Sequence, residues 1–155
     1  MAYWIFQFNP KRFRWFDWIR LEPENEQWLV SRYADEMGRG DKVAIWASGE
    51  EAGIYAIGEL VGEPRQETID PREERYFVDR SYYTRFLSGK SVRVKHLRRF
   101  VDEPILKGEC SEDQILSGMS VMSFSQVTNY RLTEGQWNRI LEILEQRREK
   151  GSAAA

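Results

Sequence analysis

Hydrophobic and polar positions alternate most clearly within the first third of the chain. Val43 and Ile45 occupy every second position, and a second run rich in β-forming residues follows after a turn containing Gly and Ser. A period of two is typical of β-strands, in which successive side chains point to opposite faces. We therefore predict strands at 41–48 and 53–61 joined by a tight turn. Trp46 is expected on the face opposite Val43 and Ile45.

The rest of the chain predicts a series of short elements separated by Gly, Pro and polar residues. In chain order, we expect a strand at 3–8, a short helix or turn at 13–19, a polar loop at 22–27 leading to Trp28, one helical turn at 33–37, a surface loop at 62–74, a strand or short helix at 76–87, a strand at 91–100, a short helix capped by Ser111 and running through Leu116, and a strand at 130–132.

The last helix has the strongest local signal. Thr133 and Gln136 fit a capping box, in which the Thr133 hydroxyl accepts a hydrogen bond from the backbone N–H of Gln136. An apolar stripe follows at the spacing of one helix face, at Trp137, Ile140, Leu141 and Leu144. We therefore predict a C-terminal amphipathic helix with Trp137 in the core.

The composition is that of one globular domain. The chain has 155 residues, of which 41% are hydrophobic and 14% aromatic, so it can bury a core without disulfides or metals. We expect a single domain over 1–150, and residues 151–155 look like a cloning remnant. Cys110 is the single cysteine, which together with the lack of a signal peptide indicates a reducing compartment, by default the cytoplasm. No apolar run is long enough to span a membrane.

The charge argues against a protein that coats phosphate backbones. The formal net charge is −2, whereas proteins that bind nucleic acid along its backbone usually carry a basic excess. Basic residues nevertheless gather at 11–14 and at 93–99. A local basic face on an acidic protein is therefore compatible with the sequence.

Catalysis has little support in the sequence. His96 is the single histidine, and with Cys110 it provides too few ligands for a His/Cys zinc site. There is no Gly-rich phosphate loop, and no acidic residue stands two positions before a lysine, as one does in many nucleases. We expect no catalytic residue, no metal and no cofactor.

Three stretches resemble the EVE domain, a PUA-like family related in fold to the YTH readers of methylated RNA. Residues 3–10 are similar to its opening strand, which ends in a polar turn with Pro. The paired strands within 40–60 are similar to its central hairpin, and 119–133 to the segment before its last helix, with Val127 where the family commonly has Gly. The resemblance implies an α+β fold: a PUA-like mixed β-barrel of about five or six strands, flanked by short helices and a C-terminal amphipathic helix.

The resemblance also implies a pocket for a single base. Such pockets hold a flipped base between aromatic rings and read its edge with polar groups. The positions implied for base or ligand binding are Asn9, Trp28, Trp46, Ser48, Gly49, Gln126, Thr128 and Asn129. The positions implied for phosphate contact are Lys11, Arg12, Arg14, Arg93, Lys95 and Arg98. Each has a structural alternative: core packing for the tryptophans, turn capping or loop hydrogen bonding for the polar residues, and a solvated face for the basic ones.

The function implied is noncovalent recognition of a flipped, methylated base of DNA or RNA by a monomer, with an effector enzyme acting in trans. A domain that binds a small molecule, such as a nucleotide or an aromatic metabolite, in the same pocket is the alternative, and the acidic charge favours it. A hydrolase would need carboxylates that converge in the pocket, and the sequence gives no sign of them.

Overall fold

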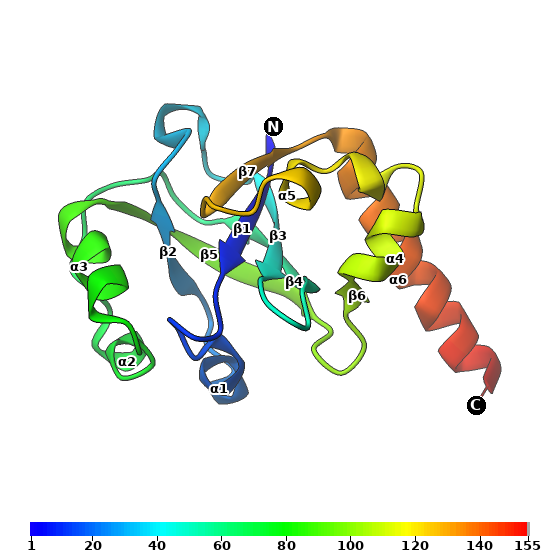
Figure 1. Ribbon diagram of the computed structural model, residues 1–155, viewed down its shortest axis with the longest axis horizontal. Coiled ribbons are helices and arrows are strands. Elements are labelled where there is room, and N and C mark those ends of the chain that lie inside the picture. Colours follow the sequence, from blue (N-terminus) through cyan, green and yellow to red (C-terminus); the bar gives the residue numbers. More distant parts are fainter. Residues whose placement is uncertain (155) are drawn as a thin grey trace.

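A mixed β-sheet curved into a half-barrel organises the fold (Figure 1). The computed structural model describes residues 1–154; Ala155, the end of the expected cloning remnant, lies outside them. The strands are β1 (Tyr3–Phe8), β2 (Glu26–Val30), β3 (Lys42–Ala47), β4 (Gly53–Leu60), β5 (Lys90–Arg99), β6 (Ile105–Leu106) and β7 (Asn129–Leu132). Their order is β2-β5-β4-β3-β1-β7, and β6 pairs with β4. The β1–β3 pair is parallel and the other pairs are antiparallel.

Short helices cover the sheet in two groups. The α-helices are α1 (Trp15–Trp18), α2 (Pro71–Glu74), α3 (Arg80–Ser88), α4 (Lys107–Glu112), α5 (Ser120–Ser123) and α6 (Glu134–Ala154), and the 3₁₀ turns are η1 (Ile19–Leu21), η2 (Ala34–Glu36) and η3 (Leu116–Gly118). In Figure 1, α2 and α3 lie beside β2 at one end of the sheet, whereas α4, α5 and α6 lie together at the other. The fold class predicted from the sequence is confirmed.

Two hydrophobic clusters lie on the two faces of the sheet, because alternate strand residues point to opposite sides. Val43 and Ile45 belong to the cluster that lines the inside of the half-barrel. Trp46 belongs to the second cluster, which also contains Trp137 and Ile140 of α6. The predicted facing of Trp46 is therefore confirmed. Trp46 is 2% exposed, so this face of the sheet is covered as well.

Asn129 joins the two ends of the sheet, β2 and β7. Its Oδ1 accepts a hydrogen bond from the backbone N–H of Ser31 at 2.8 Å, and its Nδ2 donates to the Leu29 carbonyl at 3.1 Å. Asn129 is fully buried, so these bonds also satisfy a side-chain amide that would be costly to bury unpaired. The half-barrel is closed here by one side chain.

Most predicted elements are found. The capping box is confirmed: the Gln136 N–H donates to the Thr133 hydroxyl, and the Thr133 N–H donates to Gln136 Oε1, both at 3.0 Å. Four expectations were wrong in detail. Glu26 and Gln27, expected in a polar loop, form the start of β2 and are buried. The loop at 62–74 contains the short helix α2. Ser111 lies inside α4, and Asp113 caps the following turn by accepting from two backbone N–H groups. Leu141 is 38% exposed, and Ile143 takes its expected place in the core.

The substitution Gly53→Ala tests the close contact between β4 and β6. A Cβ atom at this position would lie 2.5 Å from the carbonyl oxygen of Ile105 and 2.8 Å from the Cα of Leu106. Since both are backbone atoms, Gly53→Ala should lower the free energy of unfolding by about 1–3 kcal/mol. Gly62→Ala is the control, because a Cβ there meets nothing within 4 Å. Urea denaturation measures both; equal stabilities for the two variants would contradict this packing.

Candidate functional site

A cavity of about 300 Å³ opens where β1 and β3 end. Polar side chains and two arginines form much of its wall. The lining residues are Gln7, Phe8, Asn9, Arg12, Ser48, Tyr82, Arg85, Ser125, Gln126, Val127 and Thr128. They come from four separate segments: the end of β1 and the loop after it, the turn after β3, helix α3 and the loop before β7.

Backbone hydrogen bonds hold the polar groups at the strand ends. Asn9 begins a turn in which its Oδ1 accepts from the Lys11 N–H at 2.9 Å. The N–H of Ser48 donates to the Phe8 carbonyl at 2.9 Å, which keeps the turn after β3 beside β1. Gly49 has a φ of +101°, a conformation that residues with a Cβ rarely adopt. The sequence therefore forms a sharp turn directly at the cavity.

Gln7 anchors the loop before β7. Its Nε2 donates to the carbonyl oxygens of Ser125 and Val127, both at 2.8 Å. Because both partners are acceptors, the amide orientation is determined, and Oε1 is left buried without a partner among residues 1–154. The loop carrying Gln126 and Thr128 is thereby fixed over the end of β1.

The two arginines at the cavity have different electrostatic surroundings. Arg12 lies 3.4 Å from the carboxylate of Asp79. Hydrogen bonds from Ser81 hold the pKa of Asp79 below its usual value, so this carboxylate stays ionised and partly compensates Arg12. Arg85 has no carboxylate within ion-pair distance among residues 1–154. Arg85 is therefore the stronger candidate for binding an anionic ligand.

A second, much smaller cavity adjoins the first. It holds about 10 Å³, room for about one water molecule. Its walls are mostly aromatic: Phe8, Phe13, Trp15, Glu26, Gln27, Trp28, Phe77, Tyr82 and Phe86. Phe8 and Tyr82 line both cavities. In this structure, Trp28 therefore lies behind these two rings, in the aromatic cavity.

The carboxylate of Glu26 orients the indoles around this aromatic cavity. Its oxygens accept hydrogen bonds from Nε1 of Trp28 at 2.8 Å, of Trp15 at 2.9 Å and of Trp18 at 3.1 Å. A fourth bond, of 2.5 Å, joins it to Nε2 of His96. Burial raises the pKa of Glu26, but His96 and the indole donors outweigh this effect, and the pKa lies below its usual value. Glu26 is thus an ionised carboxylate with 1% of its surface exposed.

Arg99 determines which nitrogen of His96 carries the proton. The Nε–H of Arg99 donates to His96 Nδ1 at 2.6 Å, and the same guanidinium donates to the Pro23 carbonyl at 2.8 Å. Since Nδ1 accepts, Nε2 carries the hydrogen that is donated to Glu26. His96 therefore links a surface arginine to the buried carboxylate, and its geometry is that of a structural residue.

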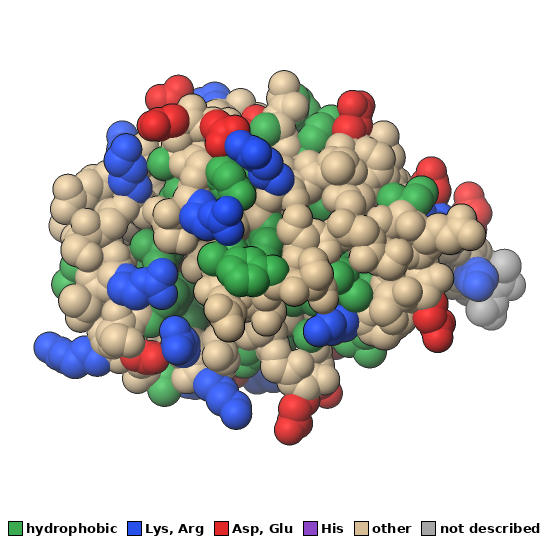
Figure 2. Space-filling view, turned by 45° about the horizontal axis from the view of Figure 1, so that its top comes forward, with side chains coloured by type: hydrophobic (Ala, Val, Ile, Leu, Met, Phe, Trp, Pro, Cys, Tyr) green, Lys and Arg blue, Asp and Glu red, His purple; other side chains and the backbone are tan. Residues whose placement is uncertain are grey.

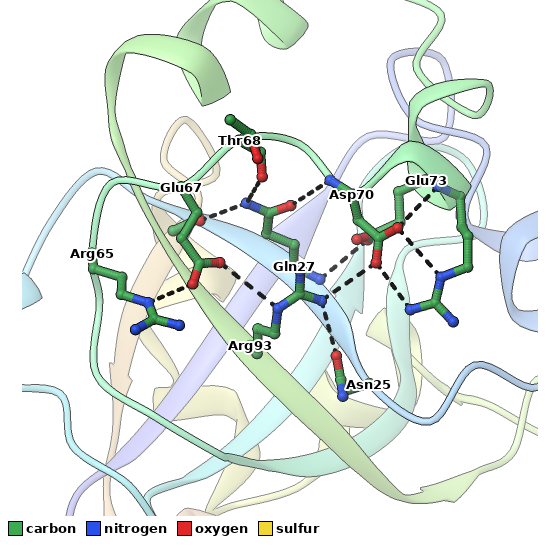
Figure 3. Close-up of polar contacts among 10 residues, drawn as sticks. Asn25, Gln27, Arg65, Glu67, Thr68, Asp70, Glu73 and Arg93 are labelled. Atoms are coloured by element: carbon green, nitrogen blue, oxygen red, sulfur yellow. Dashed lines mark hydrogen bonds and ion pairs between the residues drawn. The ribbon is translucent and has the colours of Figure 1, made fainter.

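A second polar network attaches the segment 65–73 to β2 (Figure 3). Gln27 and Arg93 are partners across the β2–β5 ladder. The Gln27 side chain bonds to Thr68, Ser91 and the Asp70 N–H, and Arg93 contacts Glu67, Asp70 and Asn25. The backbone N–H of Gln27 donates to Glu73 Oε1 at 3.1 Å. This network holds α2 in place before the chain enters α3.

The structure brings together four of the eight positions implied for base or ligand binding. Asn9, Ser48, Gln126 and Thr128 line the open cavity, and Gly49 forms the adjacent turn. The other three lie elsewhere. Trp28 is in the aromatic cavity, Trp46 is 2% exposed in the second core cluster, and Asn129 bridges β7 and β2.

The positions implied for phosphate contact are divided between two regions. Arg12 lines the cavity, and Lys11 lies beside it in the same turn. Arg14 instead pairs with Asp17 at 3.0 Å. Arg93, Lys95 and Arg98 lie on β5, which provides no residue of the cavity wall. Figure 2 shows one face with Lys and Arg side chains over its left and central parts and acidic side chains mostly at its upper and right edges.

Sequence reasoning did not place Gln7, Tyr82 and Arg85 at the cavity or Glu26 in the core. Gln7 interrupts an otherwise apolar strand, which was a usable signal for a polar group facing a site. Glu26 follows an acidic run that predicts a solvated loop. Tyr82 and Arg85 lie three positions apart, and only a confident helix prediction would have placed them on one face.

Neither a membrane span nor a metal site is evident in the part of the chain that the structure describes. No helix within residues 1–154 combines the length and the apolar character needed to cross a bilayer. Within the same range, His, Cys, Asp and Glu side chains form no group of three or more that could hold a metal ion.

The half-barrel of six to seven strands, with its short helices and C-terminal helix, is a PUA-like fold. A sequence model of the EVE domain matches residues 2–143. The chain therefore belongs to the EVE domain family. No curated protein matches the chain.

Several solved structures have the same fold. A hypothetical protein from Leishmania major is 19% identical, with a TM-score of 0.69, and the alignment covers 96% of this chain and 97% of that one. A protein from Pseudomonas syringae is 22% identical, with a TM-score of 0.65 and coverage of 92% and 99%. Human THYN1, solved in complex with DNA containing 5-methylcytosine, is 15% identical, with a TM-score of 0.67 and coverage of 92% and 97%. At sequence identities this low, the likeness to these structures shows the fold alone.

Glu26→Gln tests the buried carboxylate. The substitution keeps the shape but replaces one acceptor oxygen with an N–H₂ group that faces other donors, so the free energy of unfolding should fall by about 3–5 kcal/mol. Glu24→Gln removes the same charge at an exposed position two residues away and should stay within about 0.5 kcal/mol of the parent. Chemical denaturation monitored by tryptophan fluorescence measures both. A Glu26→Gln protein as stable as Glu24→Gln would contradict the assigned role.

The buried Glu73 carboxyl should make the stability of the fold depend on pH. Burial raises its pKa from 4.5 to about 8, with Glu26 and Asp70 adding to the effect, and the Gln27 N–H opposes it. Because the folded protein holds this proton more tightly than the unfolded chain does, its contribution to stability is complete below about pH 4.5 and is lost as the pH rises to about 8. Glu73→Gln should flatten this decline in thermal unfolding, whereas exposed Glu74→Gln should not. Identical pH profiles for the parent and Glu73→Gln would show that Glu73 is not the group responsible.

Proposed function

We propose that this EVE domain is a noncovalent reader of nucleic acid, which recognises a flipped, methylated base of DNA or RNA. The observation that carries the proposal is the open cavity of about 300 Å³. Polar side chains from three loops surround it, and two arginines lie at its wall. This combination suits a ligand that joins a flat polar ring to an anionic phosphate.

Each part of the cavity has a role in this proposal. Phe8 provides aromatic surface at the wall, and stacking a base on an aromatic ring contributes about 1–3 kcal/mol. Asn9, Ser48 and the loop 126–128 provide donors and acceptors for the edge of the base. Binding energy from these contacts offsets the cost of taking the base out of its stack.

The arginines provide the electrostatic part of recognition. Arg85 and Arg12 would hold the phosphates on either side of the flipped nucleotide, with charge-assisted hydrogen bonds. The overall net charge of −2 confines this attraction to one face and disfavours tight binding to nucleic acid that lacks a base suited to the cavity.

A relative of the same fold supports the choice of ligand. Human THYN1 was solved with DNA that contains 5-methylcytosine. We extend this to a methylated base in general, in DNA or RNA. In this proposal the protein acts as a monomer that marks a site by binding, and an effector enzyme acting in trans uses the mark.

Binding experiments with short oligonucleotides test the function and the position of the interface together. Arg85→Ala should weaken binding of a methylated oligonucleotide about tenfold, because it removes a charge-assisted phosphate contact. It should also reduce the slope of log K against log salt by about 0.9. Arg98→Ala, which removes the same charge from β5, should leave both values unchanged. Fluorescence anisotropy at several salt concentrations measures the effects.

Three outcomes would contradict the proposal. If Arg98→Ala weakens binding and Arg85→Ala does not, the interface lies on β5. Equal affinity for methylated and unmethylated oligonucleotides would remove the reader function. Binding of free nucleosides or nucleotides, with no binding of oligonucleotides and no dependence on salt, would instead favour the small-molecule function.

A further inference from the structure

The open cavity and the aromatic cavity are separated by a thin partition. Phe8 and Tyr82 line both of them, so these two side chains lie between the cavities. The two differ in chemistry: the wall of the open cavity is largely polar, whereas the closed one contains rings from five segments of the fold. The closed cavity has the more suitable surface for an aromatic ring, but its volume of about 10 Å³ is too small to admit one.

One side of the aromatic cavity is held rigidly. Trp15 and Trp28 are fixed by hydrogen bonds to the Glu26 carboxylate. Phe8 belongs to β1, which pairs with β3, and its ring lies 4.9 Å from that of Trp15. Moving any of these side chains would break buried hydrogen bonds or the sheet ladder. This side therefore forms a rigid wall.

The other side depends on α3. Of the nine residues of this helix, Tyr82 and Phe86 are buried. Their rings contact each other at 5.3 Å and contact Phe77 at 5.6 and 5.2 Å. Tyr83 is partly buried: its ring centroid lies 5.6 Å from that of Phe77, and its hydroxyl donates to Glu74. The other residues of the helix are exposed. Elements with few buried contacts have the lowest free energies of local opening.

The anchoring of the chain on either side of α3 localises this motion. The segment 65–73 is tied to β2 by the Gln27 and Arg93 network (Figure 3). The N–H of Val78 donates to the Arg12 carbonyl at 2.8 Å. After the helix, β5 begins at Lys90 and is paired on both sides. The part of the chain free to move is thus α3 itself.

We propose that α3 is a hinged cover, and that Tyr82 occupies in the ligand-free protein the ring site that a flipped base takes on binding. This inference rests on the proposed function. The ligand class is a flat aromatic ring with a small apolar substituent. Such a ring would replace that of Tyr82 beside Phe8 and in front of Trp28. Because one aromatic ring replaces another, the burial lost by Tyr82 is largely regained by the base.

The proposal predicts that the Tyr82 ring competes with the ligand. Removing a competitor raises the fraction of the protein that can bind, and the apparent affinity rises by the same factor. Tyr82→Ala should therefore bind a methylated oligonucleotide at least threefold more tightly than the parent protein, with faster association. Tyr83→Ala, at the partly exposed neighbouring position on α3, should bind like the parent. Stopped-flow fluorescence and anisotropy measure the rates and affinities.

The opposite result separates this proposal from the function on which it rests. If Tyr82→Ala is folded but binds tenfold or more weakly, Tyr82 is a fixed stacking wall and the cover proposal is wrong, while the reader function stands. If neither the parent nor the variants bind any modified oligonucleotide, the reader function itself fails.

Hydrogen exchange of the unaltered protein provides a second test, which does not require Tyr82→Ala to fold. Saturation with the methylated oligonucleotide should speed amide exchange within residues 82–88, because the helix leaves its closed position. Exchange in β1 should stay slow in both states and serves as the internal control. Unchanged or slower exchange in 82–88 on binding would overturn the proposal.

Discussion

The hydrogen bonds to one buried carboxylate determine the interior of this domain. Glu26 lies at the start of β2, and its four donors come from three elements: two from α1, one from β2 itself and one from β5. A carboxylate can be buried at this depth only if its lone pairs are satisfied. Each indole therefore donates a hydrogen bond to Glu26 and also packs against another ring of the half-barrel. The hydrogen bonding of the buried carboxylate and the packing of the aromatic rings are therefore coupled through Glu26.

This constraint explains the division of the candidate site into a rigid part and an adaptable part. The tryptophans behind the site are fixed, so they provide a constant shape. The polar groups lie on turns and loops at strand ends, and Gln7 and Gly49 determine the geometry of two of these segments. Binding residues on loops held by a rigid scaffold are a general arrangement. Helix α3 is the least anchored wall, and it carries both the free arginine and the ring that separates the two cavities.

Local signals in the sequence were sufficient for much of the fold. Alternation placed Val43 and Trp46 on opposite faces, and the capping box located the start of α6. Burial of Glu26 could not be predicted, because it depends on donors that are distant in sequence and meet only in the folded protein. For the same reason, alternation gave the face of Trp46 and could not show that this face is buried in a second core cluster. The polar loop residues were found through the family resemblance, whereas Arg85 needed the helix to be known.

The most direct test of the account is an NMR titration of the isotopically labelled protein with a short duplex, with and without 5-methylcytosine. The account predicts that the largest changes fall on the backbone amides of Asn9, Ser48 and residues 126–128 and on the Trp28 indole, and that the methylated duplex saturates them at lower concentration. Changes centred on residues 93–99 of β5, or identical titrations with the two duplexes, would contradict it.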